Sequence, residues 1–351
     1  MRYFQFLTVA LFVLFTSKVF AANDSLQDQS LKIKKTIEHH LLDDHYFTLF
    51  EDEEKSRIYG FPLPVILIDG ELKIFSSSEF FVGNRVAEQG SDFYVLDHNK
   101  IYKSNKDGKK LLIKNKYVKP LDFSITKNVV GLLLTAILMF YIFIRMAKSY
   151  KSDYNKVPRG LGRLLEPLIL FVRDEIAMPN IGREYKRFMP FLLSVFFLIW
   201  TLNILGLTPF GFNVTGSISV TFCLSIFTLL LVNLNGNKNY WKHILWMPGV
   251  PYPVRFILLP IEVLGIFSKG VSLMIRLYAN NVAGHTVIMG FIAIIYLLNE
   301  KLTIGGSIGI SMFLTIFIYF IKILAAFLQA YIFTILSSLF IGQAVQTESE
   351  H

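Results

Sequence analysis

One stretch of the chain restricts its fold more than any other. Residues 256–298 are almost uninterrupted apolar sequence, with no proline after Pro260. A single helix of this length would measure roughly 65 Å, about twice the thickness of the hydrocarbon core of a bilayer. The stretch is therefore either two membrane spans joined by a turn or one strongly tilted helix.

Composition also indicates a membrane protein. Of the 351 residues, 53% are hydrophobic and only 17% are charged, whereas a soluble domain is about a quarter charged, so a soluble enzyme is disfavoured. The net charge of +9 does not indicate nucleic-acid binding, because much of the Lys and Arg flanks apolar segments, where such charge sets topology. The single cysteine, Cys223, excludes an intramolecular disulfide and a cysteine-based metal site.

The N-terminus has the pattern of a secretory signal. Arg2 precedes a short apolar core, Phe4 to Phe15, and small residues end the pattern at Ala21. The core is shorter than a membrane span requires, which favours a cleaved signal peptide over residues 1–21 rather than an uncleaved anchor helix. Residues 22–128 are then exported to the outer side of the membrane.

The exported residues predict a small domain of β or mixed α/β type. Val65–Phe75 places two apolar runs around Asp69-Gly70, which is a strong hairpin signal. Asp92–Tyr102 predicts a second hairpin with its turn at Asp97-His98-Asn99. Ser30–Leu42 has weak helical spacing.

A local cluster of ionisable residues lies at the end of that helical pattern. It consists of His39, His40, Asp43, Asp44 and His45. Such residues can bind a metal, but a solvated helix face or turn is the commoner meaning, and we expect no metal or cofactor. The chain also lacks the nucleotide-binding and hydrolytic motifs of soluble enzymes.

Five spans are predicted in an all-α polytopic membrane domain over residues 129–345, with a long tilted helix pair at its C-terminal end. The spans are Val129–Met146, Phe188–Leu207, Ile218–Leu234, Phe256–Leu298 and Ser307–Phe340. Between the first two, LGRLLEPLILFVRDEIA is amphipathic and predicts a helix along the bilayer surface.

Charge distribution predicts the orientation. An exported N-terminal domain places the start of the first span outside, in the periplasm. The basic segment 147–187 and the polar loop Asn235–Arg255 then lie inside, and the uncharged loop Thr208–Ser217 lies outside, in agreement with the positive-inside rule. If the long stretch is one tilted helix, the tail at residues 346–351 is cytoplasmic; if it is two spans, the tail is outside.

Polar side chains recur along one face of the long stretch. They are Glu262, Lys269, Ser272, Arg276 and Asn280, spaced by 7, 3, 4 and 4 residues. An Arg or Lys at the bilayer centre costs roughly 2.5–3.5 kcal/mol on insertion scales, so such residues face protein or water and usually mark an ion path. The spacing therefore predicts a buried aqueous route.

Simpler interpretations stay open for these residues. Lys269 could extend to the membrane interface, and Glu262 could pair with Lys269 or Arg255. Arg276 could form a static buried ion pair. His285 follows two small residues and could pack as a neutral side chain against a neighbouring helix.

The last predicted span carries two more polar residues. Lys322 and Gln329 are seven residues apart and share a face. Lys322 could extend to the outer interface, and Gln329 could form a hydrogen bond with a neighbouring helix.

At this point the sequence resembles a known family. The run IEVLGIFSKGVSLMIRLYANNVAGH, together with LQAYIF in the last span, is similar to the a subunit of F-type ATP synthase. PRGL before the second span, NILGLTPF at its end and the order of five spans agree. The segments HHLLDDH and PLPVIL resemble an exported extension of some bacterial members more weakly.

The resemblance implies a subunit of the bacterial inner membrane that lies against a rotating ring of c subunits. It implies two offset half-channels for protons, with the b-subunit stator stalk, the rest of the complex and the bilayer as partners. Arg276 matches the arginine that faces the carboxylate of each passing c subunit. The other residues of the implied proton path are Asn280 and Gln329 near that arginine, Glu262, Ser268, Lys269 and Ser272 on the cytoplasmic side, and His285 and Lys322 on the outer side.

The sequence departs from the family pattern in two places. Lys322 stands where the family usually has a carboxylate or histidine facing the His285 position, so the outer half-channel must work differently here. Gly265 replaces a small polar residue on the cytoplasmic side. The rival interpretations are a stand-alone secondary transporter or channel, which predicts inverted repeats or paired broken helices, and a membrane-anchored scaffold, which leaves the buried charges without a role.

Overall fold

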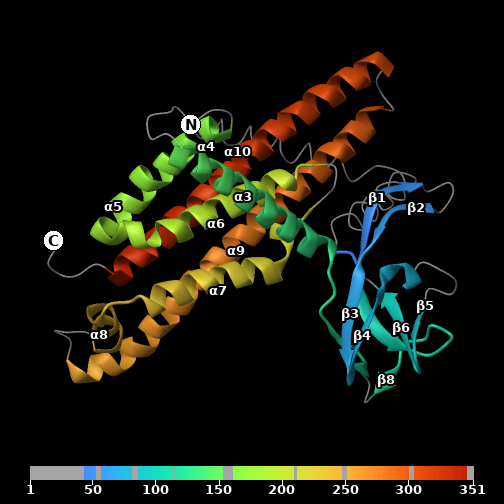
Figure 1. The fold of residues 1–351 in the computed structure, drawn as a ribbon, viewed down its shortest axis with the longest axis horizontal. Coiled ribbons are helices and arrows are strands. Elements are labelled where there is room, and N and C mark those ends of the chain that lie inside the picture. Colours follow the sequence, from blue (N-terminus) through green and yellow to red (C-terminus); the bar gives the residue numbers. More distant parts are fainter. Residues whose placement is uncertain are drawn as a thin grey trace, which may run out of the picture. The chain divides into compact units, whose positions relative to one another are not determined.

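The computed structural model describes residues 43–52, 57–80, 86–97, 99–113, 116–152, 161–208, 212–246, 251–299 and 304–345. Strands occupy the described chain before α3, and helices occupy it from there on (Figure 1). Contacts divide the chain into two units, one of which contains Asp43–His285 and the chain from Thr315 onward, while the other contains Thr286–Leu314. The predicted signal peptide, the helical pattern at Ser30–Leu42, His39, His40 and the tail at 346–351 lie outside the described residues.

The N-terminal part contains short antiparallel sheets. Their strands are β1 (Tyr46–Asp52), β2 (Arg57–Pro62), β3 (Pro64–Asp69), β4 (Glu71–Ser76), β5 (Val86–Gln89), β6 (Asp92–Asp97), β7 (Lys100–Ser104), β8 (Leu112–Ile113), β9 (Lys116–Tyr117) and β10 (Leu121–Asp122). The sheet orders are β1-β2, β10-β3-β4, β5-β6-β7 and β8-β9, and a short 3₁₀ helix, Ser77–Phe80, follows β4.

Both predicted hairpins are present. Strands β3 and β4 pair around Gly70, whose φ of 76° requires the left-handed conformation that glycine adopts without strain. Strands β6 and β7 pair from Asp97 and Lys100 outward, and Asn99 of their turn also has a positive φ, 59°. The turn residues and the alternating apolar pattern therefore fixed these strands locally.

A salt-bridge network joins the ends of two sheets. The Nζ of Lys103 lies 2.7 Å from Oδ2 of Asp69 and 2.9 Å from Oδ1 of Asp92, and Lys73 also contacts Asp92. The hydrogen bond from Lys103 lowers the pKa of Asp69, and the bonds from Lys73 and Lys103 lower the pKa of Asp92. The network thus holds β3 against β6 and β7 while both carboxylates are ionised.

We expect Lys103→Met to lower the free energy of unfolding of this part of the chain by at most about 1 kcal/mol, because the paired side chains are partly exposed to solvent. Since the folded pKa values of Asp69 and Asp92 lie below that of an unfolded Asp, about 3.9, the contribution is complete above that pH and is lost as the pH falls through the folded values. Hydrogen exchange of residues 64–104 in the full chain should be faster in Lys103→Met than in the native chain at pH 7, and similar in both at low pH. Lys100→Met, on the same strand at an exposed position, is the matched control and should exchange like the native chain.

The helical part follows β10 directly. Its helices are α3 (Lys127–Ser152), α4 (Leu161–Phe171), α5 (Met178–Ile181), α6 (Tyr185–Leu205), α7 (Ile218–Leu234), α8 (Lys238–Trp246), α9 (Tyr252–Asn299) and α10 (Ile304–Val345). A π-helical segment, Val172–Ala177, joins α4 to α5, and 3₁₀ turns lie at Gly182–Glu184 and Val214–Gly216.

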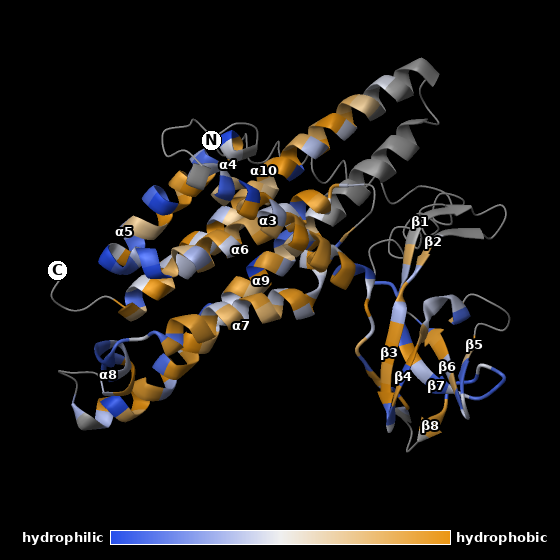
Figure 2. Cartoon of the chain, viewed as in Figure 1, coloured by the Kyte–Doolittle hydropathy of each residue, from blue (hydrophilic) through white to orange (hydrophobic). Residues whose placement is uncertain are grey.

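Helix α9 decides between the two interpretations of the long apolar stretch. It is a single helix of 48 residues, and no turn that could join two spans interrupts the stretch. The polar loop predicted after α7 differs from the structure, because it contains helix α8, which makes an angle of 100° with α7. Its hydrophilic residues were the reason for predicting a loop, and they stand out beside the apolar helices in Figure 2.

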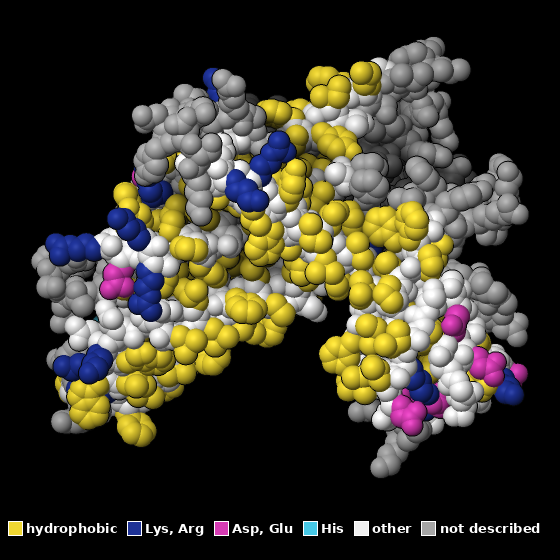
Figure 3. Space-filling model, in the orientation of Figure 1, with side chains coloured by type: hydrophobic (Ala, Val, Ile, Leu, Met, Phe, Trp, Pro, Cys, Tyr) yellow, Lys and Arg dark blue, Asp and Glu magenta, His cyan; other side chains and the backbone are white. Residues whose placement is uncertain are grey.

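Four of the helical stretches are long and apolar enough to cross a membrane, or five if α7 and α8 together count as one span. Hydrophobic side chains cover much of the visible surface of the helices in Figure 3. Soluble proteins rarely expose large contiguous apolar surface, so this covering fits a bilayer as the surroundings. The helical part is therefore a multi-span membrane region.

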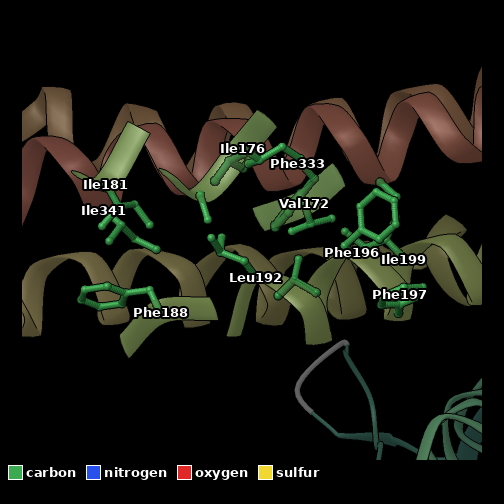
Figure 4. Close-up of a cluster of buried hydrophobic side chains, with 14 of the residues drawn as sticks. Val172, Ile176, Ile181, Phe188, Leu192, Phe196, Phe197, Ile199, Phe333 and Ile341 are labelled. Atoms are coloured by element: carbon green, nitrogen blue, oxygen red, sulfur yellow. The ribbon is translucent and has the colours of Figure 1, made fainter. Parts of the chain in front are cut away.

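The core of the helical part forms where the chain reverses after α5. Gly182 has a φ of 74° and lets α6 return along the π-helical segment. Buried side chains from this segment, α6 and α10 meet in one cluster that includes Val172, Ile176, Leu192 and Phe333 (Figure 4). The predicted amphipathic stretch is helical, and its buried side chains pack against protein.

Hydrogen bonds show which helix ends lie together. At one end Arg187 donates to the side chain of Asn235 at 2.7 Å, and the backbone N–H of Asn237 donates to the carbonyl of Ala344 at 2.8 Å. The start of α6, the end of α7 and the end of α10 therefore share one side, which we call the basic end because the segments around Arg187 and Lys238 carry its Lys and Arg residues.

The opposite end holds the start of α3 and the turn before α7. The rings of Phe47 and Phe212 are 5.6 Å apart, and a Cβ on Gly131 would come within 2.7 Å of the Phe212 ring. Asp43 accepts hydrogen bonds from the backbone of Asn128 and the hydroxyl of Thr126 and so caps α3. We call this side the capped end.

Candidate functional site

Arg276 lies on α9 between the two ends of the helical part. Seven residues before it, Lys269 reaches the basic end, and five residues after it, Asn281 reaches the capped end. At the rise of an α-helix these separations are about 10 Å and about 8 Å. Arg276 is partly buried, and no described residue gives it a hydrogen bond or an ion pair, so the static ion pair considered for it is not found.

Lys269 marks the polar cluster toward the basic end. Its ammonium group donates to Oε1 of Gln343 at 3.0 Å and lies 5.2 Å from the centre of the Phe340 ring, so the side chain turns to α10. Glu262 is close enough to interact electrostatically with Lys269, but the described residues contain no ion pair between them. Ser268 and Ser272 are exposed on the same helix.

A narrow crevice of about 10 Å³ opens beside Lys269. It lies between α7, α8, α9 and α10, and its polar lining consists of Thr228, Asn233, Tyr240 and Lys269. The Tyr240 hydroxyl donates to Asn233 at 3.1 Å. The crevice thus brings hydroxyl, amide and ammonium groups to one side of α9.

A second group of amides lies toward the capped end. Asn281 donates to Oδ1 of Asn213 at 2.8 Å, which joins α9 to the turn before α7. Thr215 of the same turn donates to Oδ1 of Asn203 on α6 at 2.8 Å. Polar side chains from three elements therefore converge where α9 approaches this end.

Helix α10 supplies a polar partner for Asn280, which lies one turn after Arg276 on α9. The amide of Asn280 donates to Oε1 of Gln329, which is buried. The structure thus brings these two predicted site residues together, and it matches the simpler interpretation of Gln329 as a hydrogen-bonding partner between helices.

Lys322 lies seven residues, about two helical turns, before Gln329 on α10. The aliphatic part of its side chain contacts α9 at Gly284. Its Cε is 3.6 Å from the place that a Cβ on Gly284 would occupy. It is partly buried and has no hydrogen-bond partner among the described residues. Lys322 therefore lies beside the backbone that precedes His285, whose side chain is outside the description.

Small residues lie beside Arg276 along the exposed flank of α9. Gly265, Ser268, Ser272, Ala279 and Ala283 follow one flank of α9 at helical spacing. A Cβ on Gly265 would meet no atom within 4 Å, and the other four are exposed. Small side chains allow a neighbouring helix to come close in a membrane.

Comparison with known proteins decides the family. The family described as the ATP synthase A chain matches residues 129–342. The chain belongs to this family. The matched segment contains the site described above except for Gln343, the residue that follows its last position, and the family assigned from the sequence resemblance is confirmed.

Similar members of the A chain family come from several bacteria. ATP synthase subunit a 2 of Chlorobaculum tepidum is 40% identical over 66% of this chain and 66% of its own length. ATP synthase subunit a of Chlorobium phaeobacteroides is 39% identical over 74% of this chain and 75% of its own length, and that of Anaeromyxobacter sp. is 41% identical over 66% and 57%. The chain thus spans about two thirds of the length of these relatives.

The strand part lies outside the A chain match. Residues 36–123 match a second family, described only as a domain of unknown function (DUF8433). The described residues contain no group of three or more His, Cys, Asp or Glu side chains suited to a metal ion. Asp44 and His45 of the predicted cluster are buried, so the prediction that they lie on a solvated face is wrong. Asp43 caps α3, and the ring of His45 lies 2.9 Å from the carboxylate of Asp122.

Sequence reasoning missed several polar residues of this a-subunit site. Asn281, Asn213, Asn203 and Thr215 form hydrogen bonds toward the capped end, and Gln343 receives Lys269. Asn281 was overlooked because it lies on a different face of the helix from Asn280. A search for amides on the faces that pack against other helices would have found it.

Proposed function

We propose that this chain is the proton-translocating stator subunit of an F-type ATP synthase membrane sector. The observation that carries the proposal is the placement of Arg276, which has no partner among the described residues and lies between polar clusters at both ends of the helical part. A cation in that place needs an external carboxylate as its partner. We infer that the c-subunit ring supplies it.

The exposed flank of α9 supports a rotor in contact with Arg276. Side chains that are small and exposed, such as Ser272 and Ala279, leave room for a helix to pass at close range. The exposed apolar residues beside them, including Ile275 and Val282, fit the apolar outer surface of a membrane-embedded ring. A ring that slides past a smooth, small-residue flank can bring one carboxylate after another to the guanidinium.

The charge of Arg276 gives the contact its chemistry. A guanidinium stays protonated at any working pH, and beside a c-subunit carboxylate it favours the ionised form. A protonated carboxylate that arrives therefore releases its proton into one half-channel and is reprotonated from the other after it leaves. Each charge that crosses the membrane potential contributes about 2.3 kcal/mol per 100 mV, and several such steps together can drive ATP formation in a distant catalytic sector.

Two groups of polar residues, one on each side of Arg276, are our candidates for the half-channels. The crevice beside Lys269, with Glu262, Ser268 and Ser272, leads toward the basic end. Asn280, Gln329, Lys322 and His285 lie on the other side of Arg276 along α9 and α10. We assign the basic end to the cytoplasm, because Lys and Arg gather there (Figure 3), and the capped end with the strand domain to the periplasm.

Assigning the basic end to the cytoplasm also fixes the location of the C-terminus and the partners in this proposal. The end of α10 is hydrogen-bonded to Asn237 at the basic end, which gives a cytoplasmic C-terminus. The b-subunit stalk and the remaining subunits complete the complex, and the chain itself carries no nucleotide site or cofactor in this proposal. Nucleic acid is not a partner.

Lys322 is the residue that we expect to distinguish the outer half-channel of this chain from that of other family members. Replacing it by methionine keeps the apolar stem over Gly284 and removes the group that can carry a proton. If Lys322 passes protons toward Arg276, pumping should fall on the order of 100-fold, the low end for a positioned acid–base group. Gly284→Ala is the control, because its Cβ would make only an ordinary contact with Lys322; an unchanged rate in Lys322→Met would remove Lys322 from the path.

The function as a whole is tested by removing the chain. Inverted membrane vesicles from cells that lack it should lose ATP-driven proton uptake, while ATP hydrolysis by the released catalytic sector continues. Restoring the native chain should restore uptake. Vesicles that pump normally without the chain would contradict the proposal.

A further inference from the structure

The sheet β10-β3-β4 has two apolar faces. One face carries Val65, Leu67 and Phe75, which are buried in the core of the strand domain. The other face carries Ile66, Ile68, Leu72, Ile74, Leu121 and Phe123, which we call the outer sheet face. An antiparallel sheet usually alternates apolar and polar residues when one face meets water, so the second apolar face requires an explanation.

The outer sheet face is continuous and exposed. Ile68 pairs with Leu121 on one side and with Leu72 on the other, and Ile66 pairs with Ile74 and accepts the backbone hydrogen bond of Phe123. Leu72, Ile74, Leu121 and Phe123 are 60–64% exposed, and Ile68 is 41% exposed. The face carries no charged side chain, and hydrophobic side chains gather over β3 and β4 in Figure 3.

The outer sheet face lies next to a membrane span along the chain. The backbone N–H of Ile125 still bonds to the carbonyl of Pro64 on β3, and α3 begins two residues later at Lys127. Phe123 is four residues from that start, so at most about 14 Å of extended chain separates them. Asp43, which caps α3, and the bond from the Lys127 N–H to the carbonyl of Asp44 connect the same domain to the helix directly.

We propose that the outer sheet face rests on the lipid bilayer beside α3. An interfacial element gains affinity from apolar area placed at the boundary between headgroups and acyl chains, where aromatic residues such as Phe123 are also accommodated. A protein partner would be expected to meet several polar groups as well as apolar ones, whereas this face adds to its six apolar residues the single hydroxyl of Ser76 at the end of β4. The short connection to α3 keeps the bilayer within reach at all times, so the contact is effectively intramolecular.

The experiment uses the full chain in proteoliposomes and exploits its single cysteine. In a Cys223→Ser background, a nitroxide label is placed at Leu72→Cys or Phe123→Cys, and at Ser91→Cys, an exposed turn position of the same domain, as the control. Collision of the label with oxygen, which dissolves in lipid, is compared with collision with a water-soluble nickel chelate. At positions 72 and 123 oxygen should dominate several-fold, and at position 91 the chelate should dominate.

Two results would overturn the proposal. Labels at 72 and 123 that meet the chelate as readily as the label at 91 would place the face in water, and labels shielded from both reagents would place it against protein. A further variant, Leu72→Thr with Ile74→Thr, keeps strand-forming residues but removes apolar contact. It should raise chelate access at position 123, and no change there would also count against bilayer contact.

Discussion

Replacing Arg276 by alanine is expected to abolish ATP-driven proton pumping while the complex stays assembled. No described residue forms a hydrogen bond or an ion pair with the guanidinium, so its loss breaks neither kind of contact within the described part of the chain. What disappears is the positive charge that favours the ionised c-subunit carboxylate and separates the two half-channels. Pumping in inverted vesicles should therefore fall to background at a normal level of assembled enzyme.

Two variants test whether the loss of pumping is caused by removing a positive charge from this particular position. Arg145→Ala removes an exposed arginine from another candidate span, α3, and should pump normally. Arg276→Lys keeps a positive charge but loses the planar fork of donors, and we expect it to pump poorly. Normal pumping by Arg276→Ala would remove the residue from the mechanism.

Gly342→Val is expected to prevent α10 from docking against α5. A Cβ at this position would lie 2.0 Å from the carbonyl oxygen of Asn180 and 3.0 Å from its carbon, both of which are backbone atoms that cannot rotate away. Ser338, one turn earlier, donates to the carbonyl of Ile176 at 2.9 Å and would lose that bond if the helices separated. We expect a cost of about 3 kcal/mol or more, the upper range for overpacking.

The measurement for this variant is the amount of chain in the membrane and in the assembled complex. Both should drop steeply in Gly342→Val. Gly309→Val makes the same change on the same helix where a Cβ meets no atom within 4 Å, and it controls for the lower helix propensity of valine. Equal losses in both variants would show that the close approach of α10 to Asn180 is not what matters.

The sequence predicted those parts of the fold that depend on local pattern. Asp69-Gly70 predicts its hairpin because the turn needs a residue with positive φ. The long run after Pro260 predicts either one tilted helix or two spans, and the structure has one continuous helix there. The reversal at Gly182 was not predicted. It depends on the apolar side chains of the π-helical segment finding α6 and α10, which are distant in sequence.

In the candidate site too, features that follow from local spacing were predicted and contacts between distant residues were not. Helical spacing placed Lys269, Arg276 and Asn280 on one face, and the pairing of Asn280 with Gln329 follows from two polar residues on facing helices. The contact of Lys269 with Gln343 was missed because the two residues are 74 positions apart in sequence, so no local spacing pairs them. The capping role of Asp43 was missed because its partners are 83 and 85 residues away in sequence.

The most direct test of the central claim is a cross-link between α9 and the c subunit. In a Cys223→Ser background, Ala279→Cys places a thiol on the exposed flank beside Arg276, and a second cysteine is introduced next to the mid-membrane carboxylate of the c subunit. The account predicts a disulfide between the two chains in native membranes, and none from Ile137→Cys, which is 66% exposed on α3. A cross-link from Ile137→Cys and none from Ala279→Cys would show that the rotor passes another face, and would contradict the account.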